Sequence, residues 1–189
     1  SCLSTSWALQ CFGGYGFTKD YIAELYYRQT RIHTLHEGTT AIHGMDLLGR
    51  KVMLQGGKAT MVLLQEVTKD ITLANGHEDL KEYAKILNHN LERLQHLTMH
   101  LMGVAQKEGP EAFLSDATLF LELFGILVMG WLWLKMAVAA KQNPQNEHGQ
   151  SILLCTQYYF AYEMPKSTGL FTRLMDTNRI TLADIEALL

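Results

Sequence analysis

Leucine recurs at intervals of seven residues in the middle of this 189-residue chain, and this spacing limits the fold more than any other feature. Apolar residues spaced in this way line one face of an α-helix and form the seam of a helical bundle. No stretch shows sustained alternation of apolar and polar residues, so the sequence predicts an all-α fold. The repeat consists of Leu80, Leu87, Leu94 and Leu101, with Ala84 and Leu91 in intermediate positions.

Helical periodicity and breaker residues predict further helices on both sides of this seam. The Thr18 hydroxyl is expected to cap the second helix, and Pro165 to interrupt the last long one. A terminal turn with capping-box chemistry is expected to open at Thr181–Asp184. Besides the seam helix, the expected helices cover residues 4–12, 18–30, 39–55, 58–74, 111–141 and 151–164.

The glycine pair Gly56-Gly57 divides the chain into two expected domains. Residues 1–55 read as the end of one helical domain, and residues 56–189 as a second bundle of about four helices. Apolar residues make up 48% of the chain and charged residues 19%, a composition that favours globular folding over disorder.

Charge and cysteine content exclude some classes of protein. The formal net charge of −3, without any basic tract, argues against a nucleic-acid partner. Cys2, Cys11 and Cys155 form no CxxC pair, which favours a reducing compartment, the cytoplasm if the protein is bacterial. The first residues contain neither an initiator methionine nor the pattern of a signal peptide, so we expect a piece of a longer protein.

Residues 119–140 are strongly apolar and require a test for membrane insertion. Glu122 and Lys135 interrupt this segment, and the uncharged run between them is shorter than the roughly 20 residues needed to cross a bilayer. We therefore expect a helix that is buried on most of its sides within a bundle, and no membrane span.

The densest group of reactive side chains lies in residues 33–40, around Glu37. Partial burial by Ile32, Leu35 and Ile42 would raise the pKa of this carboxyl and suit it to act as a general base. The alternative is a solvated carboxylate that complements the amino-terminal dipole of the following helix. A metal site built on His33, His36 and Glu37 matches no known spacing pattern, so no metal is predicted.

The glycine-rich turn Gly13-Gly14-Tyr15-Gly16 permits close approach of a phosphate to the backbone. It has neither the lysine of a P-loop nor a preceding strand, so a simple connection between helices is the alternative.

Three short segments, taken in order and with their spacing, resemble the carboxy-terminal signature of the acyl-CoA dehydrogenases. The first two are Gln10-Cys11-Phe12-Gly13-Gly14-Tyr15-Gly16-Phe17 and Tyr26-Tyr27-Arg28-Gln29-Thr30-Arg31-Ile32. The third is Glu37-Gly38-Thr39-Thr40-Ala41-Ile42. The rest of the chain resembles the additional helical domain of the longer members, which Asp46-Leu47-Leu48-Gly49-Arg50-Lys51 leads into.

This resemblance implies α,β-dehydrogenation of an acyl-CoA thioester with FAD as the cofactor. It makes Glu37 the base that removes the α-proton, with Glu37 and Gly38 contacting the substrate and the Glu37 backbone N–H holding the thioester carbonyl. By the same resemblance Gln10, Gly13 and Gly14 bind the adenosine and pyrophosphate portion of FAD, and Thr39 lies near the pyrophosphate.

Three positions depart from the family pattern. Gln29 stands where aspartate is usual, His36 replaces a common tyrosine, and Ala41 stands where a polar residue often contacts the cofactor. Some family members also carry the base elsewhere in the chain.

The resemblance also implies partners: an acyl-CoA substrate, an electron-transfer flavoprotein and further copies of the chain in a homo-oligomer. The amino-terminal helical domain and the β-domain of the family have no counterpart in these 189 residues, so we expect the chain to be inactive by itself. The alternative function is a non-catalytic helical module for assembly or dimerisation.

Overall fold

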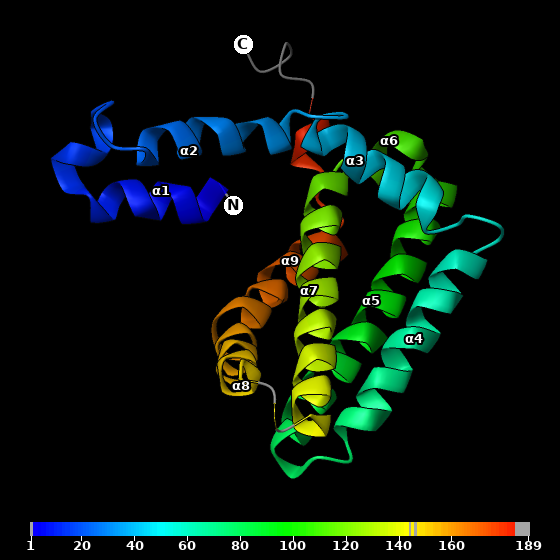
Figure 1. The fold of residues 1–189 in the computed structure, drawn as a ribbon. Helices are drawn as coiled ribbons and strands as arrows, with labels where there is room; N and C mark the ends of the chain where they lie inside the picture. The colour runs from blue at the N-terminus through cyan, green and yellow to red at the C-terminus, as the bar shows by residue number, and fades with distance from the viewer. Residues whose placement is uncertain (1, 144, 146, 184–189) are drawn as a thin grey trace. The chain divides into compact units, whose positions relative to one another are not determined.

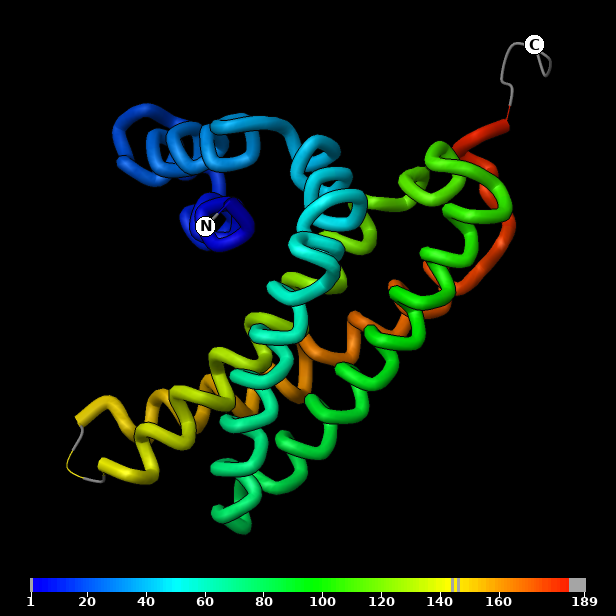
Figure 2. Tube along the Cα trace, turned by 90° about the vertical axis from the view of Figure 1, so that its right-hand side faces the viewer, coloured from blue at the N-terminus to red at the C-terminus, as the bar shows by residue number. Residues whose placement is uncertain are grey.

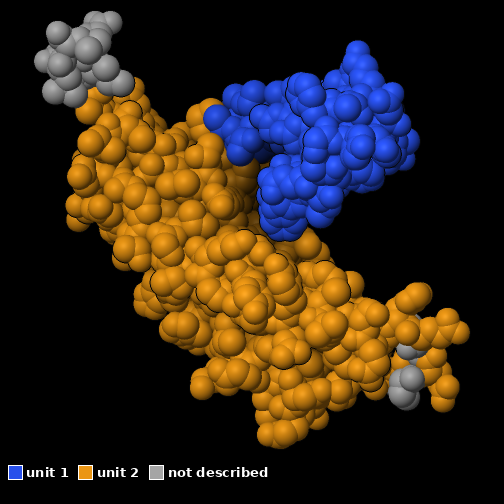
Figure 3. Space-filling view, turned by 90° about the vertical axis from the view of Figure 1, so that its left-hand side faces the viewer, with its two compact units in different colours: residues 1–43 blue, residues 44–189 orange. Residues whose placement is uncertain are grey.

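The computed structural model describes residues 2–143, 145 and 147–183 (Figure 1). Helices dominate this part of the chain and no strand occurs in it, which confirms the predicted all-α class. The chain forms two compact units, residues 1–43 and residues 44–189 (Figure 3).

Unit 1 is a short helical hairpin. Helix α1 spans Cys2–Cys11, a 3-10 turn covers Gly13–Phe17, and helix α2 spans Ala23–Thr30. A Cβ atom on Gly16 would lie 2.4 Å from the Leu9 carbonyl oxygen, so only glycine allows the turn to fold back against α1.

The predicted cap at Thr18 is wrong. The Thr18 hydroxyl donates to the Tyr15 carbonyl at 3.0 Å and thus closes the preceding 3-10 turn. Helix α2 begins five residues later at Ala23, without a side-chain cap. The Thr18 hydroxyl satisfies a carbonyl of the glycine turn, and such local bonds of threonine compete with helix initiation.

Helix α3 spans Thr40–Asp46 and continues as a π-helical turn, Leu47–Lys51. Asp46 forms ion pairs with Arg50 and Lys51, and the hydrogen bond from Arg50 lowers the pKa of the Asp46 carboxyl. The expected helix over residues 39–55 is interrupted, because the α-helical backbone changes to a π-helical turn at Leu47, before the glycine pair.

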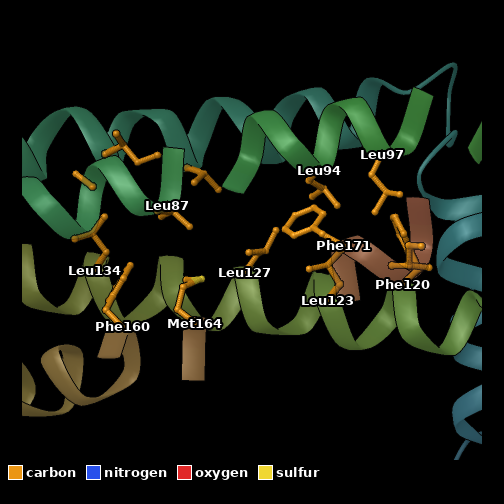
Figure 4. Close-up of a cluster of buried hydrophobic side chains, with 14 of the residues drawn as sticks. Leu87, Leu94, Leu97, Phe120, Leu123, Leu127, Leu134, Phe160, Met164 and Phe171 are labelled. Carbon is orange, nitrogen blue, oxygen red and sulfur yellow. The ribbon is translucent and has the colours of Figure 1, made fainter. Parts of the chain in front are cut away.

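Unit 2 is built around three long helices that all pack against one another: α4 over Lys58–Ala74, α5 over Lys81–Glu108 and α7 over Ala117–Gln142 (Figures 1 and 2). The leucine seam is confirmed, because all four of its leucines are buried in α5 or in the turn before it. Figure 4 shows Leu87 and Leu94 pointing toward the side chains of α7.

The predicted helix over residues 111–141 is two helices. Helix α6 covers Pro110–Leu114, and α7 begins at Ala117 after a break at Ser115 and Asp116. The break places the Asp116 carboxylate 3.1 Å from Nη2 of Arg173, a partner 57 residues away. Hydrophobic periodicity carries no information about such a distant partner.

The carboxy-terminal region also differs from the prediction. Helix α8 spans Gly149–Tyr158 and a π-helical turn follows over Tyr159–Glu163. Pro165 lies in a 3-10 turn, Met164–Lys166, that leads into an unpredicted helix α9 over Ser167–Met175. A proline in the first turn of a helix loses no hydrogen bond, so it does not end the helical path.

The predicted terminal turn is described only in part. Ile180–Leu182 forms a 3-10 turn, whereas Asp184, the expected capping partner of Thr181, lies outside the described residues.

Helix α7 is the centre of unit 2 and packs against α4, α5, α8 and α9. Within the described ranges it is the one helix long and apolar enough to cross a membrane by length and composition. Its burial is smaller than expected, because a stripe formed by Met129, Leu132 and Met136 is exposed.

Candidate functional site

The candidate catalytic carboxylate, Glu37, lies in an unusual backbone turn directly before α3. Its φ angle is 60°, and the φ angle of the following Gly38 is 118°. Glutamate rarely adopts the left-handed region, which disfavours residues with a Cβ atom. Residues held in this way concentrate at functional sites, so the turn marks Glu37 as a functional candidate.

The Glu37 side chain is 79% exposed, and Oε1 lies 3.5 Å from Nε2 of His36. The predicted partial burial of this carboxyl is therefore wrong for the chain by itself. Ile32, Leu35 and Ile42 are themselves exposed and leave the carboxylate open to solvent. An accessible carboxylate of this kind can accept a proton from a ligand, but a second surface must exclude water from it.

A separate hollow in unit 1 contains two of the predicted cofactor residues. Gln10 and Gly13 line a space of about 470 Å³ between α1, the glycine turn and α2. Arg28 also lines it and lies 4.0 Å from Glu24, its ion-pair partner one helical turn away. Gly14 is next to this hollow in sequence but does not line it.

The hollow has two features that suit a phosphate group. A Cβ atom on Gly13, whose φ angle is 59°, would have no neighbour within 4 Å, so the backbone is open to a ligand. The exposed Arg28 guanidinium supplies a positive charge, and its planar fork matches phosphate oxygens. These two features suit a phosphate-bearing ligand.

The sequence-predicted residues therefore form two groups in unit 1. Gln10 and Gly13 belong to the hollow, whereas Glu37, Gly38 and Thr39 belong to the turn before α3 and do not line the hollow. Sequence reasoning missed Glu24 and Tyr27 as lining residues. The spacing of Glu24 and Arg28 by four residues was the available signal, because it places both on one face of α2.

The histidines near Glu37 form no metal centre with it. Among the residues that the structure describes, no group of three or more His, Cys, Asp or Glu side chains is placed to hold a metal ion.

Two family models match the chain and meet near the predicted domain boundary. The model described as "Acyl-CoA dehydrogenase, C-terminal domain" matches residues 2–53, and the model described as "Acetyl-CoA dehydrogenase C-terminal like" matches residues 63–184. The first contains the turn and the hollow, and the second contains the bundle of unit 2.

Curated relatives that match the chain are named as CoA-thioester dehydrogenases or reductases. The chain is 31% identical over 138 residues to the broad-specificity linear acyl-CoA dehydrogenase FadE5 of Mycobacterium tuberculosis, covering 70% of this chain and 23% of that protein. It is 31% identical over 137 residues to the 3-methylmercaptopropionyl-CoA dehydrogenase of Ruegeria pomeroyi, covering 72% and 23%. Acryloyl-CoA reductase (NADH) of Anaerotignum propionicum is 47% identical over 49 residues, 26% of this chain and 12% of that protein.

An all-helical fold whose sequence matches these models over most of its length defines the carboxy-terminal portion of an oxidoreductase. The chain belongs to the acyl-CoA dehydrogenase family. It spans about a quarter, 23%, of the length of the two relatives that it matches over most of its own residues.

Proposed function

We propose that this chain is part of an FAD-dependent enzyme that removes hydrogen from the α and β carbons of an acyl-CoA thioester. The observation that carries the proposal is the left-handed backbone conformation of Glu37, which Gly38 follows directly before α3. The two relatives that match more than two thirds of the chain are named as acyl-CoA dehydrogenases, which supports this direction of the reaction.

In the proposed reaction the Glu37 carboxylate takes the proton from the α carbon. The backbone N–H of Glu37 donates a hydrogen bond to the thioester carbonyl, which stabilises the negative charge that develops on this oxygen. Gly38 lets the substrate approach the backbone closely, because it has no side chain. The accessible carboxylate and the adjacent backbone donor therefore act on neighbouring atoms of one substrate.

The remaining residues of unit 1 would hold the cofactor. Gln10, Gly13 and Gly14 would contact the adenosine and pyrophosphate portion of FAD, with Arg28 as the charge partner and Thr39 near the pyrophosphate. When bound, FAD supplies the acceptor for the hydride that leaves the β carbon.

The proposal extends to the partners of the enzyme. The substrate is an acyl-CoA, the electron acceptor is an electron-transfer flavoprotein, and the enzyme is a homo-oligomer. The exposed Glu37 carboxylate requires a covering surface. The part of the enzyme that corresponds to the other three quarters of the relatives' length would supply this surface. We therefore expect the 189-residue chain by itself to lack turnover.

A test replaces Glu37 by glutamine in the longer protein that contains this chain. Loss of the proton acceptor should reduce kcat by about 10²- to 10⁴-fold while FAD remains bound. The control is Asp20→Asn, which neutralises an exposed carboxylate of unit 1 outside the turn and the hollow. FAD content, measured by absorbance, shows that the cofactor site is intact.

The same experiment tests the second candidate function, a helical module for assembly. The exposed apolar stripe on α7 favours this candidate, since such surface can serve as an interface. Unchanged turnover in Glu37→Gln would reject Glu37 as the base and favour the assembly role.

A further inference from the structure

A cavity of about 350 Å³ lies inside unit 2, between α4, α5 and α7. Figure 4 shows Leu94 of α5 and Leu127 of α7, two of its lining residues, on facing sides of the space between these helices. The cavity has more than twice the volume of an engineered apolar cavity of roughly 150 Å³ that stays dry and binds benzene. Its apolar lining includes Leu64, Val67, Leu91, Leu94, Phe124 and Leu127.

The cavity offers few groups that could bind water. Three of its fifteen lining residues are polar, and no charged side chain lines it among the residues that the structure describes. The Thr60 hydroxyl donates to the Val52 carbonyl, and the Thr98 hydroxyl to the Leu94 carbonyl, each at 2.8 Å. Gln95, the third polar residue, is exposed. The interior therefore suits a hydrocarbon and not an ion or a cluster of waters.

The two ends of the cavity differ in the residues that line them. At one end the Trp131 indole N–H donates to the Asp70 carboxylate at 2.6 Å, and Lys135 lies 3.5 Å from the same carboxylate. At the other end Met99 is 62% exposed and marks the mouth, and the exposed Gln95 lies one helical turn before it. A ligand would therefore enter with its apolar end first and keep its polar end near Met99.

Length and volume agree on the size of the ligand. The lining on α5 runs from Leu91 to Met99, which is about 12 Å along the helix at about 1.5 Å per residue. An extended alkyl chain advances about 1.3 Å per carbon, given C–C bonds of about 1.5 Å, so this length holds roughly ten carbons. The volume of about 350 Å³ holds on the order of ten to twelve groups the size of a water molecule, each about 30 Å³.

The packing of the three helices also favours a small ligand over a peptide helix. Helices α4, α5 and α7 each contact the other two, so the cavity lies within a triangle of packed helices. A peptide helix of about 10 Å diameter cannot enter such a space without separating them, whereas a single hydrocarbon chain can.

We propose that the cavity between α4, α5 and α7 binds one unbranched aliphatic chain of about ten carbons, with its polar end at the mouth beside Met99. The inference rests on unit 2 alone and does not depend on the chemistry proposed for Glu37. Fatty acids, fatty alcohols and acyl thioesters share this tail, and the test separates these sources.

The test titrates the 189-residue chain with saturated fatty acids of six to sixteen carbons and follows binding by calorimetry. Affinity should rise by up to about fourfold per methylene until the chain has about ten carbons, and then level off when the cavity is full. A continuous rise beyond this length would indicate adsorption to exposed apolar surface and would overturn the proposal, as would no binding.

Decanol and decanoyl-CoA provide two further titrations. Similar affinities of decanol and decanoate would show that the tail carries recognition, as proposed. Binding of decanoyl-CoA alone would place recognition on the CoA group and contradict the proposal.

Two phenylalanine variants on α7 provide the matched comparison. Val128→Phe fills the cavity and should weaken decanoate binding at least tenfold, whereas Ile126→Phe, a partly buried position that does not line it, should leave binding within about twofold. Leu64→Phe on α4 repeats the test if Val128→Phe does not fold. Equal loss in the cavity-filling and control variants would reject the cavity as the site.

Sedimentation of the same samples tests other occupants. Concentration-dependent dimerisation that decanoate does not alter, together with absent fatty-acid binding, would assign the exposed residues at the mouth to contact with a second copy of the chain and overturn the proposal.

Discussion

At the scale of a single residue, Tyr159 shows how packing changes an ionisable group. Its phenol lies between α7 and the π-helical turn after α8, and its O–H donates to the Ile126 carbonyl at 2.9 Å. Burial, with a smaller contribution from the Glu163 charge, raises the pKa of Tyr159 to about 12. The neutral phenol is therefore part of the folded state.

This pKa predicts how stability depends on pH at the alkaline end. An unfolded tyrosine has a pKa of about 10, so between about pH 10 and 12 the folded chain keeps a proton that the unfolded chain releases. The stabilisation from Tyr159 is complete below pH 10 and is lost as pH rises through the folded pKa. Ultraviolet titration of tyrosinate should show one late-titrating group that is missing in Tyr159→Phe. If the group that Tyr159→Phe removes titrates at about pH 10 with the other tyrosines, the assignment is contradicted.

At the scale of elements, two helical glycines differ in the space that is available for a side chain. A Cβ atom on Gly44 of α3 would lie 2.7 Å from the carbonyl oxygen of Ala117 and 2.8 Å from its carbonyl carbon. Backbone atoms cannot rotate away as a side chain can. Gly125 of α7 has no atom within 4 Å of the corresponding position.

Alanine substitution at these two sites should change stability in opposite directions. Gly44→Ala should lower the free energy of unfolding by about 1–3 kcal/mol, because α3 must move away from the start of α7. Gly125→Ala should raise it by up to about 1 kcal/mol, because alanine restricts the unfolded chain and favours the helix. Urea denaturation of both variants measures the difference, and the same sign for both would reject the steric argument.

At the scale of the whole chain, the two units differ in how much apolar surface they bury. The buried apolar core lies in unit 2, apart from Ala23. In the described part of unit 1, residues 2–43, Gly16 and Ala23 are the buried residues. Apolar burial is the main favourable term in folding, so unit 1 gains little stability of its own.

Hydrogen exchange of the 189-residue chain should report this contrast. Amides of α1 and α2 should exchange with low protection, whereas the central turns of α5 and α7 should exchange only at the rate set by global unfolding of unit 2. Tyr83, whose ring centroid lies 4.9 Å from that of Phe160, provides a reference region inside unit 2. Equal protection across both units would show that unit 1 has stability that its burial does not explain.

The sequence by itself determined the all-α class, the leucine seam of α5 and the family to which the chain belongs. These depend on local periodicity and on short segments at fixed spacing, which are properties of neighbouring residues along the chain. The turn at Glu37 was also located from sequence, because a carboxylate directly before glycine and a helix start is a local pattern.

Only the tertiary structure decided where helices break and which surfaces are covered. The break before α7 depends on Asp116 meeting Arg173, and the path through Pro165 depends on the packing of Met164 in the core. The exposure of Glu37 and the cavity beside Leu94 likewise depend on which helices lie opposite one another. Residues far apart in the chain create these features, so the periodicity within one segment does not contain them.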